Sequence, residues 1–256
     1  MKKIEKGTYA IVTGASSGIG RAIALELAAQ GANLILVARR RDRLEQLKAI
    51  IVNKYKVDTI IFDEDLTKAE NCKSLYENTK KYNAEIIVNN AGFGICGFFS
   101  EGDLDLELEM IRLNIESLHI LTKLYLSTMS KGVIMNVASV AGFIPTPLMA
   151  TYAATKAYVN NFSRALNYEM KVQKRDIRVL SLCPGPVKTD FWTIAKANQS
   201  KYALPVERCA RAAVRGIINN KLVIIPGKMM KFARLLIKIL PVNWILPTLY
   251  KIQKRK

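Results

Sequence analysis

The chain has 256 residues, of which 50% are hydrophobic and 23% charged, so it can bury a full core without disulfides or a structural metal. This composition excludes a disordered tail, a collagen-like fibre and a small disulfide-stapled secreted module. The four cysteines are far apart and form no CxxC pair, and His119 is the only histidine. We therefore expect free thiols in a reducing compartment, no bound metal and no histidine-based catalytic triad.

The net charge of +18 is unevenly distributed. Residues 201–256 carry 13 Lys and Arg against one acid, a net charge of +12, and the first 200 residues carry the remaining +6. A basic excess attracts nucleic acid, anionic membranes or phosphorylated ligands. No helix-turn-helix, zinc finger or aromatic-rich single-strand platform accompanies the charge, so we do not expect nucleic acid as a partner.

The beginning of the chain does not resemble a targeting segment. MKKIEKGTY leads into an apolar run of only four residues, 9–12, which is too short for the core of a signal peptide. No stretch of 18 uncharged apolar residues occurs, so we expect no membrane-spanning helix. These observations favour a cytoplasmic protein, either free or attached peripherally to a membrane.

Short runs rich in Val, Ile and Leu alternate with segments of helical periodicity. The expected strands, several of them apolar almost throughout, are 9–13, 33–38, 57–62, 85–89, 132–138, 177–182 and 222–226. The expected helices are 21–31, 41–55, 104–130, 151–174 and 206–220, and Gly31 is a natural C-cap for the first.

This alternation predicts an α/β fold: a single-domain, doubly wound parallel sheet of the Rossmann type, with about seven strands and helices on both faces. No linker, repeat or change of composition occurs before about residue 226. We therefore expect one domain over 1–226, which binds a dinucleotide and carries the catalytic residues, and a basic, amphipathic helical extension over 227–256.

A glycine-rich turn follows the first strand. Glycines at 14, 18 and 20 permit a tight turn and the close approach of a pyrophosphate, and the following helix presents free N–H groups to the anion. The position of the motif between strand and helix in the first βαβ unit favours a dinucleotide site over a turn without a ligand. The predicted contacts in this turn are Gly14, Ser16, Ser17, Gly18, Ile19 and Gly20.

The residues after the second strand indicate which dinucleotide binds. A site for the unphosphorylated form places Asp or Glu there, but this chain has Arg39, Arg40 and Arg41, with no carboxylate before Asp42. Guanidinium groups match a phosphate dianion. We therefore predict NADP(H), with Arg39 as the main contact and Arg40 or Ser16 in support. The alternative, a solvated helix face, suits Arg41 better than Arg39.

A Tyr-x-x-x-Lys pair is the candidate proton-transfer group. Tyr152 and Lys156 lie four residues apart, on one face of an expected helix, and Ser139 ends the fifth strand 13 residues upstream of Tyr152. For a phenol to act near neutral pH, its pKa must fall by roughly 2–3 units from about 10. An adjacent ammonium and the positive ring of an oxidised nicotinamide have the right sign for this.

Taken together, these motifs closely resemble the short-chain dehydrogenase/reductase family. The matching elements occur in the family's order and spacing over about residues 8–225: TGASSGIG (13–20), NNAG (89–92), Asn114, Ser139, YAATK (152–156) and PGPVKT (184–189). The stretch NNAGFGICGFF and the long C-terminal segment look like the broad subgroup of bacterial reductases of varied specificity. The resemblance implies an NADP(H)-dependent oxidoreductase that interconverts a carbonyl and a secondary alcohol by hydride transfer.

The resemblance also implies a role for each matching catalytic residue. Tyr152 would be the general acid in reduction and the base in oxidation, and Lys156 would lower its pKa and hold the nicotinamide ribose. Ser139 would position the substrate carbonyl, and Asn114 would hold a water that links Lys156 to solvent.

Further cofactor contacts follow from the same resemblance. Asp65 and Leu66 would contact the adenine, whereas Asn90, Ala91 and Gly92 would line the cofactor. Near the nicotinamide would lie Pro184, Gly185, Val187 and Thr189.

The substrate side is predicted to be apolar, which suits a small-molecule carbonyl or alcohol that is hydrophobic. The candidate pocket residues, some of which core packing explains equally well, are Phe93, Ile95, Cys96, Phe98, Phe143, Ile144, Met149 and Phe191. The sequence does not distinguish 3-oxoacyl, steroid, sphingoid-base or simple aliphatic carbonyls, nor the physiological direction.

The segment 228–256 combines basic and apolar residues at helical spacing. Lys228, Lys231, Arg234 and Lys238 form one basic face, and KIQKRK closes the chain. One interpretation is an amphipathic helix lying on an anionic membrane. The other is that its apolar face caps the substrate pocket or packs against a second subunit.

Two further alternatives stay open at the level of the sequence. The fold would also suit a catalytically silent nucleotide-sensing or scaffold protein, although such proteins need not retain all of Asn114, Ser139, Tyr152 and Lys156. The family's usual assembly implies a homodimer or a homotetramer built on helices near 104–130 and 151–174.

Overall fold

The protein is built on one parallel β-sheet, seen in a computed structural model that describes residues 4–195, 197 and 202–254. Seven strands pair in parallel in the order β3-β2-β1-β4-β5-β6-β7. They are β1 (Tyr9–Thr13), β2 (Asn33–Val37), β3 (Thr59–Phe62), β4 (Ile86–Asn89), β5 (Lys131–Val137), β6 (Asp176–Leu182) and β7 (Val223–Ile224). The predicted α/β fold with a seven-stranded parallel sheet is thus confirmed, and each strand overlaps its predicted range.

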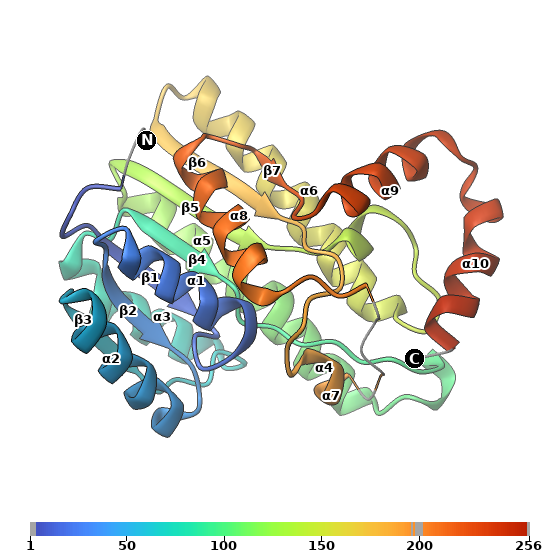
Figure 1. Cartoon of the computed structure of the whole chain (residues 1–256), viewed down its shortest axis with the longest axis horizontal. Helices are drawn as coiled ribbons and strands as arrows, with labels where there is room; N and C mark the ends of the chain where they lie inside the picture. The colour runs from blue at the N-terminus through green and yellow to red at the C-terminus, as the bar shows by residue number, and fades with distance from the viewer. Residues whose placement is uncertain (1–3, 196, 198–201, 255–256) are drawn as a thin grey trace.

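Helices cover both faces of the sheet (Figure 1). The α-helices are α1 (Gly18–Ala29), α2 (Arg41–Tyr55), α3 (Ala69–Thr79), α4 (Leu104–Ile111), α5 (Ser117–Thr128), α6 (Ala150–Val172), α7 (Phe191–Ile194), α8 (Val206–Ile218), α9 (Lys228–Ile239) and α10 (Val242–Lys254). A π-helical segment, η3 (Arg112–Glu116), joins α4 to α5. Short 3-10 turns are η1 (Lys80–Tyr82), η2 (Phe99–Glu101) and η4 (Val140–Phe143).

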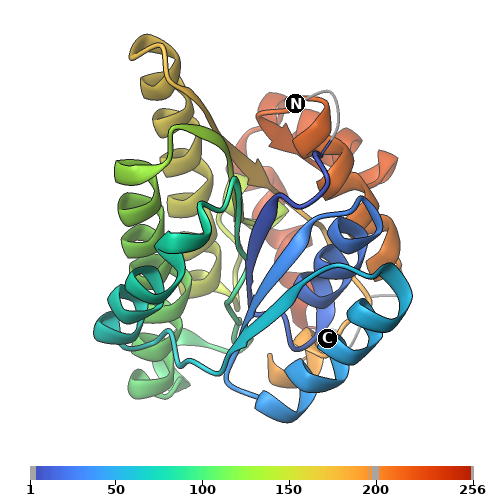
Figure 2. The ribbon, with the colours of Figure 1, turned by 90° about the vertical axis from the view of Figure 1, so that its left-hand side faces the viewer.

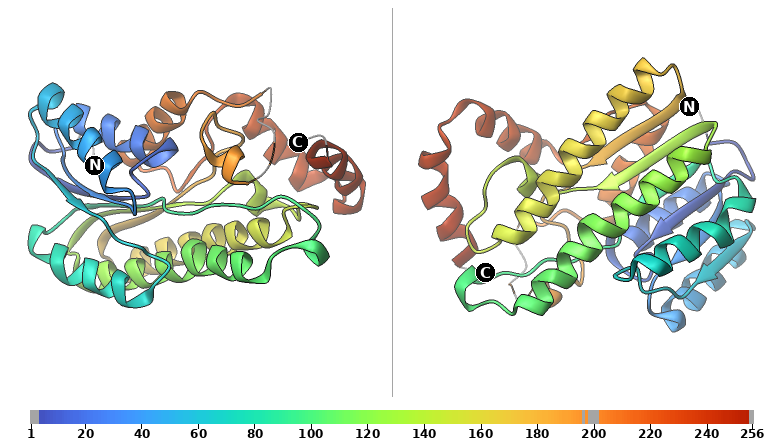
Figure 3. Two further views of the ribbon diagram at one scale, coloured as in Figure 1. Left: turned by 90° about the horizontal axis from the view of Figure 1, so that it is seen from below. Right: turned by 180° about the vertical axis from the view of Figure 1, so that it is seen from behind.

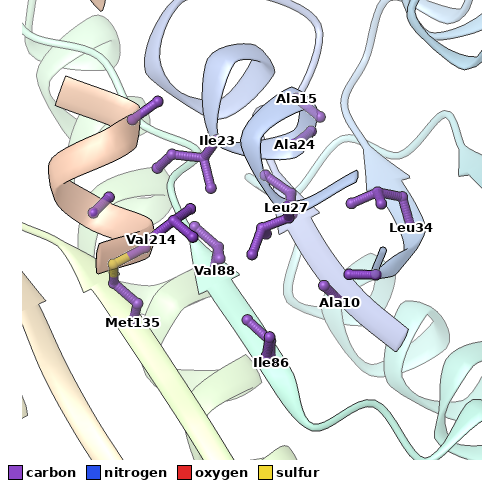
Figure 4. Close-up of a cluster of buried hydrophobic side chains, with 14 of the residues drawn as sticks. Ala10, Ala15, Ile23, Ala24, Leu27, Leu34, Ile86, Val88, Met135 and Val214 are labelled. Carbon is purple, nitrogen blue, oxygen red and sulfur yellow. The ribbon is translucent and has the colours of Figure 1, made fainter. Parts of the chain in front are cut away.

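Alternate strand residues point to opposite faces, which divides the core into two layers. One layer packs α1, α2 and α8 against residues such as Val12 and Val88, and Figure 4 shows Ile23, Leu27 and Val214 meeting over these strands. The other layer packs α3, α5 and α6 against the strand residues that point to the opposite face of the sheet, such as Ile11. Figures 2 and 3 show the two helical layers with the sheet between them. Because both faces are covered, the central strands are apolar throughout.

Two helical expectations differ from the structure. The apolar periodicity at 104–130 predicts one helix, but a π-helical segment interrupts it at 112–116. The helix α3 was not predicted, because AENCKSLYENT is polar and offers only Cys72, Leu75, Tyr76 and Thr79 to the core. Such a short, mostly polar segment becomes helical through packing rather than through intrinsic propensity.

The strand order reverses on either side of β1, because β2 and β4 flank it. In open parallel sheets, the crevice outside the carboxyl ends of the strands at such a switch point is where ligands bind. The chain therefore has a preformed ligand position beyond Thr13 and Asn89.

The C-terminal helices α9 and α10 lie outside the two layers and project to one side of the sheet (Figures 1 and 3). Neither helix contains a buried residue. Across the described residues, no helix combines the length and the hydropathy required to cross a bilayer.

Candidate active site

A cleft of about 620 Å³ runs along the carboxyl ends of the strands. Its wall includes residues that stand one or two positions after six of the seven strands: Gly14, Ala38, Glu64, Asn90, Ala138 and Pro184. Every residue predicted to bind the cofactor or to act in catalysis lines this cleft, except Gly20 and Asn114. The tertiary structure therefore gathers 19 of the 21 predicted residues around one cavity.

The glycine-rich turn has the conformation that its sequence requires. Gly14 and Gly18 have φ of 65° and 54°, in the left-handed region that favours glycine. A Cβ on Gly14 would lie 2.7 Å from the Asn90 side-chain amide, and a Cβ on Gly20 would collide with the same amide. Gly20 thus serves the close packing of α1 on the turn, which explains why it does not line the cleft.

The NNAG segment is tied directly to the glycine turn. The hydroxyl of Thr13 accepts the backbone N–H groups of Asn90 at 2.9 Å and of Ala91 at 3.0 Å. The Asn90 amide donates to the Thr13 carbonyl at 2.9 Å. These bonds join the ends of β1 and β4 and fix the floor of the cleft. At the start of α1, the N-cap Ser17 makes no side-chain cap bond, so the first amides of the helix are available to an anion.

The two predicted phosphate contacts have different partners. Arg40 donates to the hydroxyls of Ser16 at 2.9 Å and Ser17 at 2.8 Å, and so sits over the glycine turn. Arg39 instead forms an ion pair with Glu109 of α4 at 3.2 Å, with its side chain 59% exposed. Both arginines line the cleft, but among the described residues only Arg39 has a competing carboxylate, which the sequence did not reveal.

The candidate catalytic pair lies on α6, as its spacing predicts. The Lys156 ammonium is 5.8 Å from the centroid of the Tyr152 ring and donates to the Val137 carbonyl at 2.9 Å. Burial lowers the pKa of Lys156 from 10.5 to about 8. Burial also raises the pKa of Tyr152 from 10.0 to about 12, and a hydrogen bond with Ser139 partly opposes this rise.

The direction of the tyrosine shift differs from the expectation. Proton transfer near neutral pH calls for a lowered phenol pKa, but the folded chain alone raises it, because desolvation penalises the phenolate. Tyr152 therefore keeps its proton at neutral pH, which suits a proton donor. A base role in the reverse direction needs additional positive charge beside the ring.

Ser139 and Asn114 are held by different networks. Ser139 lies two residues beyond β5, where its hydroxyl accepts from the Ala141 N–H at 3.2 Å and donates to the Pro184 carbonyl at 3.4 Å. Asn114 lies in the π-helical segment, and its amide bridges the Phe93 backbone and, at 3.1 Å, the Thr155 hydroxyl. It therefore packs behind the cleft wall, between that wall and α6, rather than in the cavity.

The segment after β6 forms part of the cleft wall. The Trp192 indole donates to the Val187 carbonyl at 2.9 Å, and the Thr189 hydroxyl accepts from the Phe191 N–H at 3.3 Å. The centroids of the Phe191 and Tyr152 rings are 5.5 Å apart. The PGPVKT segment thus lines the cleft, and Phe191 of α7 lies beside the candidate catalytic pair.

Of the eight predicted pocket residues, three line the cleft: Phe93, Met149 and Phe191. Phe98 instead contacts Tyr250 of α10, at 6.5 Å between ring centroids, and Phe143 lies under the Arg234 guanidinium. The other three lie outside the cleft wall.

Several wall residues carried no usable signal in the sequence. Glu64 lies just after β3, Glu109 on α4 and Gln253 on α10, and no local motif marks them. Leu106 and Trp192 are likewise placed only by packing. Among the described residues, no group of three or more His, Cys, Asp and Glu side chains is arranged to hold a metal ion.

His119 and Cys183 are held by neighbouring side chains or buried in the protein interior. His119 is exposed, bonds the Tyr158 hydroxyl at 2.6 Å and stacks on Phe162. Burial raises the pKa of the Cys183 thiol to about 11, so this cysteine near the site is not a thiolate at neutral pH.

A parallel sheet with a glycine turn at its switch point and a Ser-Tyr-Lys group in the adjoining cleft defines a dinucleotide-binding α/β oxidoreductase. The chain belongs to the short-chain dehydrogenase family, whose model matches residues 8–200. The resemblance predicted from the motifs is thereby confirmed.

Known proteins agree with this assignment. A very-long-chain 3-oxoacyl-CoA reductase of Anas platyrhynchos is 34% identical over 97% of this chain and 81% of its own length. Hydroxysteroid dehydrogenase-like protein 1 of Gallus gallus is 38% identical over 76% of this chain, a match that spans 60% of that protein. A short-chain dehydrogenase from Sphingobium yanoikuyae in complex with NADPH superposes with a TM-score of 0.81 at 29% identity, covering 91% of this chain and 96% of that one.

Proposed function

We propose that this chain is an NADP(H)-dependent reductase that interconverts an apolar carbonyl compound and its secondary alcohol, with Tyr152 as the general acid and base. The observation that carries the proposal is the cleft itself: one cavity joins the glycine turn to Ser139, Tyr152 and Lys156. These groups are separated by more than a hundred residues in the sequence, and a scaffold protein has no need to bring them together.

The cleft residues fit a nicotinamide dinucleotide. The absence of a side chain at Gly14 lets the turn pack closely on Asn90 and Ala91. The first amides of α1, together with the Ser16 and Ser17 hydroxyls, supply donors for a pyrophosphate. When bound, the nicotinamide ring supplies the hydride, and that chemistry belongs to the cofactor. In this proposal Asp65 and Leu66 hold the adenine, whereas Asn90, Ala91, Gly92, Pro184, Gly185, Val187 and Thr189 line the rest of the site.

The choice of NADP(H) over NAD(H) rests on charge. Arg39 and Arg40 follow β2, where an unphosphorylated cofactor calls for a carboxylate. Arg40 already points at the serines of the turn, so a 2′-phosphate there would meet a guanidinium without rearrangement. The NADPH complex of the Sphingobium relative supports the same choice.

The proton chemistry follows from the two shifted pKa values. Tyr152, whose pKa is raised to about 12, carries a proton that it can donate to a carbonyl oxygen as that oxygen gains charge. Lys156 has its pKa lowered to about 8. It can therefore pass a proton to Tyr152 and take up another one near neutral pH. Ser139 donates a hydrogen bond to the carbonyl. Asn114 positions this group by fixing the Phe93 backbone and Thr155.

The proposed substrate is hydrophobic. Beside the catalytic group the wall presents Phe93, Leu113, Met149 and Phe191, so a polar substrate would lose hydration there without gaining partners. One relative is, by its name, a reductase of very-long-chain 3-oxoacyl-CoA. Another is named as a protein that resembles hydroxysteroid dehydrogenases. The long acyl chain and the steroid skeleton to which these names refer are both large and apolar.

Assembly and location complete the proposal. We expect a homodimer or homotetramer, a cytoplasmic protein, and peripheral contact with anionic membrane through 228–256. We also retain the division into a catalytic domain over 1–226 and an extension over 227–256 as part of this proposal.

A side-by-side fluorescence titration with NADPH and NADH tests the cofactor. Wild type should prefer NADPH, and Arg39→Ala and Arg40→Ala should each lose most of that preference. Arg41→Ala is the matched control, because Arg41 pairs with Asp63 at 2.9 Å and lies outside the cleft wall. Equal affinity of wild type for both nucleotides would overturn the NADP(H) assignment.

Oxidation of NADPH with a panel of apolar ketones tests the reaction. Tyr152→Phe removes only the hydroxyl and should reduce kcat by at least about a hundredfold, the usual contribution of a positioned acid. Nucleotide affinity should stay within about twofold, because the lost group is not a phosphate contact. Binding of NADPH without turnover on any ketone by wild type would instead favour the silent scaffold.

A further inference from the structure

The two C-terminal helices expose several large apolar side chains to solvent. In α9, Phe232, Leu235 and Ile239 are 61%, 53% and 69% exposed, and in α10 Trp244 is 73% exposed. Single exposed apolar residues are ordinary, but a contiguous group of them marks a surface that contacts a partner or a membrane. Figure 1 shows both helices standing away from the sheet.

The α9 helix has two distinct faces. Its half-buried residues, among them Met230 and Arg234, recur at helical spacing and turn toward the protein, where Arg234 lies 4.8 Å from the Phe143 ring centroid. The outward face is apolar and is formed by Phe232, Leu235 and Ile239, with Lys231 and Lys238 along one flank. The single basic face expected from the sequence is therefore wrong at Arg234, which turns inward.

The α10 helix repeats this arrangement. Its half-buried residues, Ile245, Leu246, Leu249, Tyr250 and Gln253, share one face that turns toward the protein. The tip of that face reaches the candidate active site, because Tyr250 contacts Phe98 and Gln253 lines the cleft. The opposite face carries Trp244, Lys251 and Ile252 to solvent.

A second cleft, of about 570 Å³, opens between α8, β7 and α9. Five cationic side chains line it and no carboxylate does: Arg208, Arg211, Arg215, Lys221 and Lys231. Within the described part of the chain, none of the five forms an ion pair. So many unpaired cations in one concavity repel one another, which makes the cleft a strong site for an anion.

The cationic cleft adjoins the outward face of α9, because Lys231 lines the cleft and also lies along the flank of that face. We infer that the α8–β7–α9 cleft receives the phosphate headgroups of an anionic bilayer while Phe232, Leu235, Ile239 and Trp244 enter its interface. The two features together then define one orientation of the protein on the membrane, which a basic tail alone would not.

Charge decides between a bilayer and a second copy of this chain as the occupant. From residue 208 to the C-terminus the sequence contains no Asp or Glu. Two copies meeting through this surface would place cation against cation around an apolar contact. An anionic bilayer instead offers phosphates to the cleft and acyl chains to the apolar face, and Trp244 suits the region between them.

This orientation has a consequence for the substrate, which rests on the proposed function. Because α10 ends at the wall of the candidate active site, docking would hold the cleft beside the bilayer. A hydrophobic carbonyl dissolved in the membrane would then reach Tyr152 without crossing bulk water.

The test is flotation of the full chain with vesicles of phosphatidylcholine alone and of phosphatidylcholine mixed with phosphatidylglycerol. Wild type should float only with the mixed vesicles, with a blue shift of tryptophan emission. That shift reports on Trp244, because Trp192, the only other tryptophan, is already buried at 8% exposure. Added salt should weaken the binding.

Two variants separate the parts of the surface. Replacing Arg211 and Arg215 by Gln removes two cations from the cleft and should weaken partition into mixed vesicles by about 30-fold. Replacing Phe232, Leu235 and Ile239 by Ser should weaken it by more than about tenfold. The matched control, Lys54→Gln with Lys73→Gln, removes the same charge from α2 and α3 at the opposite edge, and should change partition by less than about twofold.

Thermal melting and NADPH binding verify that each variant folds. Equal flotation with neutral and mixed vesicles, or none with either, would overturn the inference. So would an equal loss in the α2–α3 control, because the net charge would then explain the binding. A third outcome would make a second copy of the chain the occupant of this surface. In that outcome wild type is a dimer that binds no vesicles, and the variant with Ser at Phe232, Leu235 and Ile239 is a monomer. Since flotation needs no turnover, its failure is distinct from failure of the proposed reaction.

Discussion

The buried ammonium of Lys156 allows a quantitative test of the candidate site. This side chain is 5% exposed and donates one hydrogen bond, to the Val137 carbonyl at 2.9 Å. Burial lowers its pKa from 10.5 to about 8. The substitution Lys156→Met keeps the length of the side chain and removes the charge, so it removes the desolvation penalty.

The sign of the effect follows from where the proton is bound. Between about pH 8 and 10.5 the unfolded chain retains a proton on this lysine and the folded protein has lost it. Stability rises with pH wherever the unfolded state binds more protons. Wild type therefore pays the full penalty below about pH 8 and loses it as the pH rises to 10.5. A shift of about 2.5 units, at about 1.4 kcal/mol each, corresponds to about 3 kcal/mol.

Urea unfolding of wild type and of Lys156→Met, without nucleotide, measures this quantity. The free energy of unfolding of wild type should gain about 3 kcal/mol relative to the variant between neutral pH and the pKa of a free lysine. The comparison of two pH values cancels the lost hydrogen bond to Val137. Lys73→Met, an exposed lysine on α3, should show no such change. Parallel pH profiles of wild type and Lys156→Met would refute the assignment of a strongly lowered pKa.

Three further outcomes follow from the contacts in and around the cleft. Glu109→Gln removes the exposed ion pair of Arg39, so the affinity for NADPH should rise by about two- to fivefold and that for NADH should not, as paired titrations would reveal. Gly20→Ala places a methyl group against the Asn90 amide and should lower the free energy of unfolding by about 1–3 kcal/mol in urea; an unchanged midpoint would contradict the close packing. Cys96, half-buried, should be the one thiol that reacts quickly with a disulfide reagent in the native protein, because the other three are buried; four fast thiols would disprove this.

The sequence predicted the elements that local patterns encode. Seven apolar runs became the seven strands, and the glycines at 14, 18 and 20 became the turn at the switch point. The spacing of Tyr152 and Lys156 placed both on one helix. By contrast, α3 escaped prediction because its few core residues lie within a polar segment, and packing against α5 rather than periodicity stabilises it.

The partners of charged side chains were beyond the reach of sequence patterns. Arg39 and Glu109 are 70 residues apart, and only the approach of α4 to the end of β2 brings them together. Arg234 appeared to belong to an exposed basic face, but the angle at which α9 docks turns it onto Phe143. Such pairs depend on how whole helices are oriented, which spacing along one helix does not specify.

The sequence by itself determined the fold, the family and the motif residues of the cleft, because strand burial and glycine turns are encoded by neighbouring residues. Only the tertiary structure decided the electrostatics. The raised pKa of Tyr152 and the lowered pKa of Lys156 arise from burial, which depends on elements far away in the chain. The cationic cleft likewise exists only because α8, β7 and α9 converge, and that convergence places the basic charge of the C-terminal region beside its apolar face.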